Sequence, residues 1–269
     1  MDINRMIRRA DRELCTWILR RSSLSKKIEH YQRRYDGQIL RSLLLPPVVE
    51  ELRESCVLVD YAGRRTYGLA DICRFLEVFD TVSFDLFDTL LFRDTTSPAG
   101  IFNLVGQELG IPNFQCTRIA AEQAARKRKF QTDGTYEVTL AEIYSMLPSS
   151  ACGGMEEELR QERRHCHIDV AMWQLVESLY QKGKQVVITS DMYLTAEQLA
   201  GLLRHAGYTF PGKLYVSNQY GCSKADGRLF SLVQKDCGAI RLVHIGDNFA
   251  SDILMSRQAG IPAVHCLQP

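Results

Sequence analysis

The sequence contains no long hydrophobic run. Hydrophobic residues make up 45% of its 269 residues and charged residues 24%, which is typical of an ordinary globular protein. None of the apolar stretches approaches the ~18 consecutive residues that a membrane-spanning helix needs. The first five residues, Met1 to Arg5, also lack the apolar centre of a secretory signal peptide. We therefore expect a soluble, cytoplasmic protein without a membrane span.

The nine cysteines form no recognisable metal site or disulfide framework. No two of them have the Cys-x-x-Cys spacing, and an odd number without a signal peptide favours reduced thiols in the cytosol. The tripeptide His165-Cys166-His167 resembles a metal-binding sequence when it is taken alone. It lies in a polar stretch that we predict to be helical, with no second pair of ligands nearby. We therefore expect it to have a structural or surface role.

The net charge of the chain is +1, but basic residues are concentrated near the N-terminus. Residues 1–43 hold 11 Lys and Arg against 5 Asp and Glu. Apolar residues recur at three-, four- and seven-residue steps between Arg5 and Leu45, which predicts a helix that ends at Pro46-Pro47. This basic helix is either a solvated extension or a docking surface for a protein partner, and direct membrane binding is less favoured. The balanced overall charge, without interleaved aromatic and basic residues, argues against nucleic acid binding.

From residue 80 onward, apolar runs alternate with segments of helical periodicity. The predicted strands are Thr81–Phe87, Gln185–Ser190, Lys213–Ser217, Arg241–Ile245 and Ala263–Cys266. A helix follows the second strand: Thr195 and Gln198 have the spacing of a capping box, and Gly207 is placed to end the helix. Strands and helices that alternate at this length predict an α/β fold with a doubly wound parallel sheet.

A long segment between the first two strands has a different pattern. It contains five predicted helices and no convincing strand: Ile101–Leu109, Ile119–Phe130, Leu140–Leu147, Glu156–His167 and Ala171–Gln181. We therefore predict three parts. Residues 1–79 form a helical N-terminal extension, in which Cys56–Val59 is compatible with a short strand. Residues 80–94 and 182–269 form the α/β core, and residues 95–181 form an inserted helical cap.

Chemically useful side chains lie near the ends of several predicted strands. Asp85 and Ser190 lie at the ends of the first and second strands, and Asp247 comes just after the fourth. Lys224 stands in the loop after the third strand, and Asp252 follows Asp247 by five residues. In an open α/β sheet, ligands bind outside the carboxyl ends of the strands. A carboxylate nucleophile, a hydroxyl, a lysine and a pair of acids are what a metal-assisted attack on a phosphate ester requires.

Four segments, in this order, resemble the motifs of the haloacid dehalogenase-like (HAD) hydrolase superfamily. They are SFDLFDTL at 83–90, VVITSD at 186–191, SKAD at 223–226 and HIGDNFASD at 244–252, and the resemblance covers about residues 80–266. The resemblance implies a Rossmann-like core, a cap that closes over the active site and carries most of the substrate selectivity, and Mg²⁺ as the cofactor.

The resemblance also implies roles for individual residues. Asp85 is the nucleophile that forms an aspartyl-phosphate, Ser190 binds a phosphoryl oxygen, and Lys224 offsets negative charge. Thr189 competes with Ser190, because the strand could end one residue earlier, but the Ser190-Asp191 pair matches the family pattern better. The implied metal-binding groups are Asp85, the backbone carbonyl of Phe87, Asp247 and Asp252, with Asp252 acting through water or ordering the site.

One position departs from the family pattern. Most phosphatases of the superfamily have a second aspartate two residues after the nucleophile, which protonates the leaving alcohol, whereas this chain has Phe87. Asp88, the next residue, is a candidate substitute. Three functions therefore compete: a Mg²⁺-dependent phosphohydrolase or phosphotransferase, a carbon–halogen hydrolase, and a binding or regulatory module with little turnover. The acids Asp247 and Asp252 favour the first, because the dehalogenase branch needs no metal.

Two of the motif sequences are similar to those of a subgroup that is found beside or fused to glycosyltransferases in bacterial surface-polysaccharide pathways. FDLFDTLL at 84–91 with Arg93, and SDMYL at 190–194, carry this similarity. It implies a sugar, polyol or nucleotide-linked phosphate as substrate, and a glycosyltransferase or a second copy of the chain as partner of the basic N-terminal helix. Arg93 either binds the phosphate or pairs with a cap acid. The basic cluster Arg126–Lys129 is either a solvated helix face or an anion contact.

Overall fold

The computed structural model describes residues 56–62 and 65–267. The predicted basic helix of the first 45 residues lies outside this part of the chain. Within the described residues, no helix combines the length and the apolar character needed to cross a bilayer.

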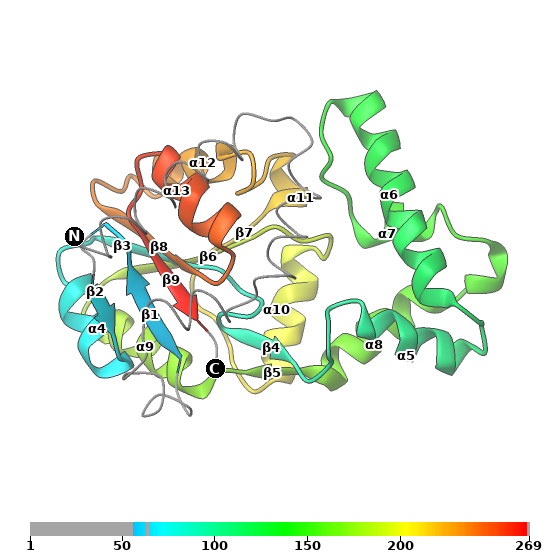
Figure 1. The fold of residues 1–269 in the computed structure, drawn as a ribbon, viewed down its shortest axis with the longest axis horizontal. Coiled ribbons are helices and arrows are strands. Elements are labelled where there is room, and N and C mark those ends of the chain that lie inside the picture. The colour runs from blue at the N-terminus through cyan, green and yellow to red at the C-terminus, as the bar shows by residue number, and fades with distance from the viewer. Residues whose placement is uncertain (1–55, 63–64, 268–269) are drawn as a thin grey trace, which may run out of the picture. The chain divides into compact units, whose positions relative to one another are not determined.

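A seven-stranded, mostly parallel sheet forms the core (Figure 1). Four neighbouring strands run parallel to one another, and the predicted site residues lie at or after their ends. They are β3 (Thr81–Phe84), β6 (Gln185–Ser190), β7 (Leu214–Val216) and β8 (Leu242–Gly246). The strand β9 (Ala263–Leu267) extends the sheet beside β8, also in parallel. With β1 (Val57–Asp60) and β2 (Arg65–Tyr67), the sheet order is β2-β1-β9-β8-β3-β6-β7, so that β3 lies between β8 and β6. This arrangement confirms the predicted α/β fold.

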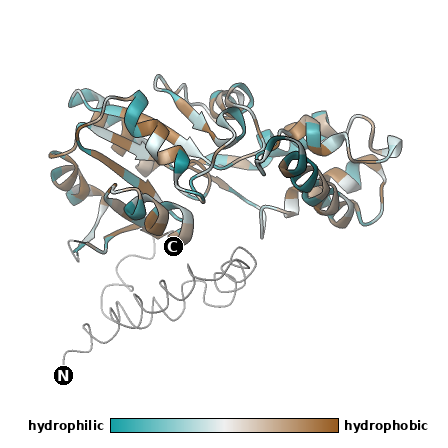
Figure 2. Ribbon diagram, turned by 90° about the horizontal axis from the view of Figure 1, so that it is seen from above, coloured by the Kyte–Doolittle hydropathy of each residue, from teal (hydrophilic) through white to brown (hydrophobic). Residues whose placement is uncertain are grey.

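Helices cover both faces of the sheet, and each face has its own apolar core. One cluster joins the sheet to α4 (Leu69–Leu76), α9 (Val170–Gln181) and α10 (Ala196–His205), and the other joins it to α12 (Arg228–Asp236) and α13 (Met255–Gln258). Adjacent residues of β6 alternate between the two, with Ile188 in the first cluster and Val187 in the second. Figure 2 shows the hydrophobic residues concentrated along the central strands. The capping box of Thr195 and Gln198 opens α10 as predicted.

The sheet begins earlier in the chain than the predicted domain boundary at residue 80. β1 (Val57–Asp60) pairs antiparallel with both β2 (Arg65–Tyr67) and β9. Residues 57–76 are therefore part of the α/β core and not of a purely helical extension. The pairing joins segments about two hundred residues apart, so that no local pattern in the sequence could reveal it.

The inserted segment, which we call the cap, consists mainly of helices, and a two-stranded ribbon connects it to the core. Its helices are α5 (Gly100–Leu109), α6 (Phe114–Asp133), α7 (Leu140–Tyr144), the short η1 (Ser149–Ala151) and α8 (Gly154–His165). The ribbon consists of β4 (Leu91–Arg93) and β5 (Cys166–Ile168). The predicted helix over 156–167 therefore ends at His165, and Cys166 and His167 are in a strand. Both His165 and His167 contact the Asp94 carboxylate, at 2.6 and 3.0 Å, which fastens the base of the cap.

The last predicted cap helix, α9, belongs to the core. Its residues Met172, Val176 and Leu179 are buried in the same cluster as Ile72 and Leu76 of α4. The indole nitrogen of its Trp173 donates to the carbonyl of Leu90, at 3.1 Å, close to the start of the ribbon. The boundary of the cap therefore lies near residue 165 and not at 181. An amphipathic helix has the same apolar period in either place, which is why its sequence did not distinguish them.

A buried ion pair holds the cap helices together. The guanidinium of Arg118 on α6 binds both carboxylate oxygens of Glu158 on α8 at 2.8 Å, and both side chains are 0% exposed. The hydroxyl of Tyr144 donates to the same carboxylate, and the ring of Phe102 on α5 lies 4.5 Å from the guanidinium. The guanidinium also lies 4.8 Å from the ring of Tyr193, which belongs to the core. One arginine therefore contacts four helices or loops.

We predict that Arg118→Met destabilises the protein by about 3–5 kcal/mol, because it leaves the Glu158 carboxylate buried without its partner. Arg241→Met is the matched control, since Arg241 pairs with Asp80 on the surface and such pairs contribute at most about 1 kcal/mol. The measurement is the free energy of unfolding in urea. Equal effects of the two substitutions would contradict a central role for the buried pair.

Candidate active site

Three aspartates meet at the carboxyl edge of the central strands. Asp85 directly follows β3, Asp247 directly follows β8, and Asp252 lies in the π-helix η2 (Phe249–Leu254). Carboxylate oxygens of the three lie within 4.8 Å of one another. The parallel order β8-β3-β6 brings these residues together although they are distant in the sequence.

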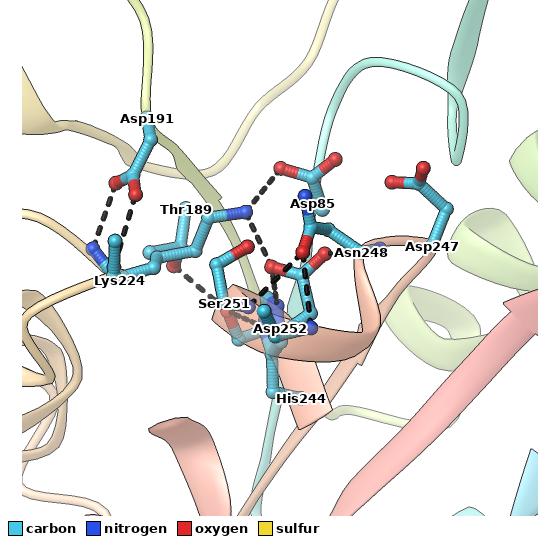
Figure 3. A network of polar contacts seen from close by, with 12 residues as sticks. Asp85, Thr189, Asp191, Lys224, His244, Asp247, Asn248, Ser251 and Asp252 are labelled. Atoms are coloured by element: carbon cyan, nitrogen blue, oxygen red, sulfur yellow. Dashed lines mark hydrogen bonds and ion pairs between the residues drawn. The ribbon is translucent and has the colours of Figure 1, made fainter. Parts of the chain in front are cut away.

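The amino group of Lys224 lies between two of these acids (Figure 3). Its Nζ atom contacts Oδ1 of Asp85 and lies 2.6 Å from Oδ1 of Asp252. Burial alone would lower the pKa of Lys224, but the charges of Asp252 and Asp85 outweigh that effect and raise it. The lysine is therefore permanently charged at neutral pH. The structure thus places Lys224 in contact with two of the three aspartates.

Three groups bind the Asp252 carboxylate. Its Oδ1 faces Lys224 and the Nε2 atom of His244, and its Oδ2 accepts from the backbone N–H of Asn248 at 2.9 Å. Burial would raise the pKa of Asp252, but Lys224 and His244 lower it well below the ordinary range. Gly246 has no room for a side chain, because a Cβ there would collide with the Asp252 carboxylate. Asp252 is therefore held rigidly as an anion.

Thr189 and Ser190, the two candidates for the hydroxyl that binds a phosphoryl oxygen, have different surroundings. The Thr189 hydroxyl is fully buried and bonds the Ser83 hydroxyl, with 2.8 Å between the oxygens. Ser190 is the last residue of β6, and its hydroxyl has no hydrogen-bonding partner among the described residues. Of the two, Ser190 is the one whose hydroxyl remains available for a ligand.

Asp191 anchors the loop that carries Lys224. Its carboxylate accepts the backbone N–H groups of Lys224 and Ala225, at 2.7 and 3.1 Å. In the sequence, Asp191 stands out only as part of a motif, and no separate role was predicted for it. A short acidic side chain directly after a strand often binds backbone N–H groups of a neighbouring loop, but the sequence alone does not say which loop.

His244 is a second residue whose role the sequence did not reveal. It lies within the apolar strand β8 and is 0% exposed. Burial lowers the pKa of its imidazole, although Asp252 opposes the shift, so the ring is neutral at physiological pH. The signal was present in the sequence, since a histidine in a strand of otherwise apolar residues needs a buried partner.

The site contains more carboxyl groups than the single Lys224 ammonium group can neutralise. Burial raises the pKa of Asp85 to about 7 against the opposing effect of Lys224. Burial, followed by the charges of Asp85, Asp252 and Asp88, raises the pKa of Asp247 well above its ordinary value. Carboxylate oxygens are the ligands that Mg²⁺ prefers, and a cation between these two acids would remove their mutual repulsion. The donor set therefore fits a magnesium ion.

Phe87 and Arg93 have structural partners. The Arg93 guanidinium lies 4.0 Å from the centre of the Phe87 ring and binds both carboxylate oxygens of Glu162 at 2.9 Å. Of the two roles that the sequence left open for Arg93, pairing with a cap acid is the one observed. In the basic cap cluster, Arg126 binds Glu122 and Lys129 binds Glu142, so these two charges are neutralised within the cap.

Comparison with known proteins supports the fold. No protein-family model and no curated protein matches the chain. Among solved structures, a dehalogenase has a TM-score of 0.50 at 12% identity, with 70% of this chain and 84% of that chain covered. The HAD-hydrolase YfnB from Bacillus subtilis, bound to magnesium, has a TM-score of 0.49 at 19% identity, with 69% and 87% covered. A HAD phosphatase from Thermococcus onnurineus has a TM-score of 0.47 at 15% identity, with 68% and 84% covered. The first likeness shows a shared fold, and it does not extend to the reaction.

The raised pKa of Asp85 makes the stability of the metal-free protein depend on pH. Between its ordinary value of 3.8 and about 7, the folded protein holds a proton that the unfolded chain has lost. The stabilising contribution is therefore complete below about pH 4 and disappears as the pH rises through 7. We predict that Asp85→Asn, which cannot ionise, becomes more stable relative to wild type over this range, by up to about 1.4 kcal/mol per pH unit.

The measurement is urea unfolding of both proteins in EDTA from pH 4 to 8. Asp71→Asn, on the exposed side of α4, is the control and should run parallel to wild type. A difference between Asp85→Asn and wild type that does not change with pH would contradict the raised pKa.

Proposed function

We propose that the protein is a HAD-like, Mg²⁺-dependent phosphohydrolase that acts on a small phosphorylated metabolite through an aspartyl-phosphate on Asp85. The observation that carries the proposal is the group of three aspartates beside one buried lysine, which contacts two of them and cannot neutralise all three. Such a site favours a cation together with an anionic substrate. The four motif segments and the shared fold agree with it.

Each residue of the site would have its own role in the proposed reaction. Asp85 and Asp247, with the backbone carbonyl of Phe87, would hold the magnesium ion, and Asp252 would order the site. The ion would supply positive charge against the phosphoryl oxygens. Lys224 orients the Asp85 carboxylate and opposes the rise of its pKa, and the Ser190 hydroxyl would donate to a phosphoryl oxygen.

The reaction then takes two steps. An oxygen of the Asp85 carboxylate attacks phosphorus, and the bond from phosphorus to the leaving oxygen breaks as that oxygen takes up a proton. Water afterwards attacks the phosphorus of the aspartyl-phosphate and restores the carboxylate. Carbon–halogen hydrolysis is the second candidate, because Phe87 supplies the aromatic residue of that branch. The metal-compatible acid group weighs against it.

The motif sequences support a narrower proposal for the substrate and the partner. A sugar, polyol or nucleotide-linked phosphate agrees with the similarity to the glycosyltransferase-associated subgroup. A glycosyltransferase remains our proposed partner on the same ground.

We predict that the protein releases inorganic phosphate from one or more members of a panel of sugar, polyol and nucleotide phosphates in Mg²⁺, and that EDTA abolishes the release. Asp85→Asn should lower kcat by at least about 10³-fold, because it removes the nucleophile. Asp71→Asn should behave as wild type. Halide release from 2-halo acids without metal would instead establish the dehalogenase. No turnover by a folded, Mg²⁺-binding wild type would favour the binding module.

Asp88 is our proposed replacement for the missing general acid. Its φ of 57° lies in the left-handed region, which a glycine adopts without cost and an aspartate adopts less readily. Its side chain is exposed, and its charge is close enough to raise the pKa of Asp247. An acid kept in a strained backbone position beside the nucleophile loop is the pattern of a functional residue.

We predict that Asp88→Asn and Asp88→Gly both lower kcat on alkyl phosphates by about 10²–10⁴-fold, because the alkoxide then leaves without a proton. The loss should be small on 4-nitrophenyl phosphate, whose leaving group is a weak base. Asp88→Gly should at the same time keep or increase the free energy of unfolding, since glycine relieves the backbone strain. Equal losses on both kinds of ester would rule out proton donation by Asp88.

A further inference from the structure

The imidazole of His244 takes no part in the reaction as proposed, yet it lies directly behind the site. Its Nε2 atom is 3.2 Å from Oδ1 of Asp252, and its Nδ1 atom is 2.9 Å from the Ser83 hydroxyl oxygen. The ring packs edge-on against Phe230, with 4.9 Å between the ring centres. Both nitrogens of a fully buried ring are therefore occupied.

The direction of these hydrogen bonds follows from their partners. The Asp252 carboxylate is ionised and can only accept, so Nε2 of His244 must donate to it. In the neutral ring Nδ1 then accepts the proton of the Ser83 hydroxyl, and the oxygen of Ser83 accepts from Thr189. The hydrogen bonds thus run in one direction from Thr189 to Asp252, and they fix a single tautomer of the imidazole.

The chain of hydrogen bonds crosses three neighbouring strands. Thr189 is in β6, Ser83 is in the central strand β3, and His244 is in β8, where it is the register partner of Ser83. All three side chains are completely buried. They therefore form a polar layer on the sheet face where His244 packs against Phe230, close to the Asp252 carboxylate (Figure 3).

The oxygen that His244 contacts is the same one that binds Lys224. Oδ1 of Asp252 receives the imidazole N–H and the ammonium group, and the ammonium group also contacts Asp85. Rotation of the Asp252 carboxylate would move the lysine and, through it, the nucleophile. The imidazole of His244, which projects from strand β8, opposes this rotation together with the backbone N–H of Asn248.

We propose that His244 is a positioning residue for the phosphoryl-transfer site: through its Nε2–H it holds Asp252, and hence Lys224 and Asp85, in the reactive arrangement, while Ser83 and Thr189 fix its tautomer. This inference rests on the proposed function for its catalytic consequence. Its structural half, the fixed tautomer and the oriented Asp252, is independent of turnover.

The first experiment compares His244→Phe with His244→Gln. Phenylalanine preserves the ring and removes both nitrogens, whereas the amide nitrogen of glutamine can take the place of Nε2. We expect His244→Phe to lower kcat by about 10–100-fold with little change in KM, and His244→Gln to recover most of the loss. His205→Phe, on the exposed end of α10, should have no effect.

The second experiment needs no activity. In protein labelled with ¹⁵N-histidine, the His244 signal, assigned by its loss in His244→Gln, should show a protonated Nε2 and an unprotonated Nδ1. Ser83→Ala removes the donor to Nδ1, and the tautomer preference should weaken. Binding of Mn²⁺, followed by its EPR signal, should weaken about 10–100-fold in His244→Phe and less in His244→Gln.

The outcomes separate the inference from the proposed function. A wild type that shows the Nε2–H tautomer and the expected Mn²⁺ results but releases no phosphate would support the positioning role and contradict the phosphohydrolase. A protonated Nδ1, or a His244→Phe variant with unchanged kcat and Mn²⁺ affinity, would overturn the inference. If His244→Phe fails to fold, the tautomer and its response to Ser83→Ala decide the question.

Discussion

The organisation of this protein depends on one buried charge, the ammonium group of Lys224 between Asp85 and Asp252. A buried ammonium group is tolerated only when anions and hydrogen bonds replace its lost hydration. The two carboxylates do so, and in return Lys224 allows Asp252 to remain ionised in the interior. The carboxyl groups of Asp85 and Asp247 nevertheless have raised pKa values, because Lys224 does not fully offset the cost of ionising them in the interior. A bound cation would supply the missing positive charge.

The surrounding structure serves mainly to hold these charges in place. Asp191 fixes the loop of Lys224 to the end of β6, and the missing side chain of Gly246 lets the Asp252 carboxylate approach the end of β8. The rigid parallel sheet supplies the reference frame, because neighbouring strands keep a fixed register and their carboxyl ends stay level. A site built on strand ends is positioned more precisely than one built on loops alone.

The sequence was informative where structure is local and uninformative where it is not. The polar residues Asp85 and Ser190 near the strand ends could be predicted, because an apolar run followed by a polar residue is visible in a few residues of sequence. The first strand nevertheless ends at Phe84 and not at the predicted Phe87. Three features depend on distant partners: the pairing of β1 with β9, the packing of α9 in the core, and the strand that begins at Cys166. The same is true of His244, whose partners Ser83 and Asp252 meet it only in the folded sheet.

The aromatic residue two positions after Asp85 has a structural explanation. The ring of Phe87 stacks on Arg93 of the ribbon strand β4, and Arg93 is bound by Glu162 near the end of α8. A carboxylate at position 87 would lose this stacking and would compete with Glu162 for the arginine. The loop after Asp85 and the base of the cap are therefore joined through one buried ion pair. Because the residue at position 87 is committed to this contact, the reaction that we propose needs its proton from another side chain, for which Asp88 is our candidate.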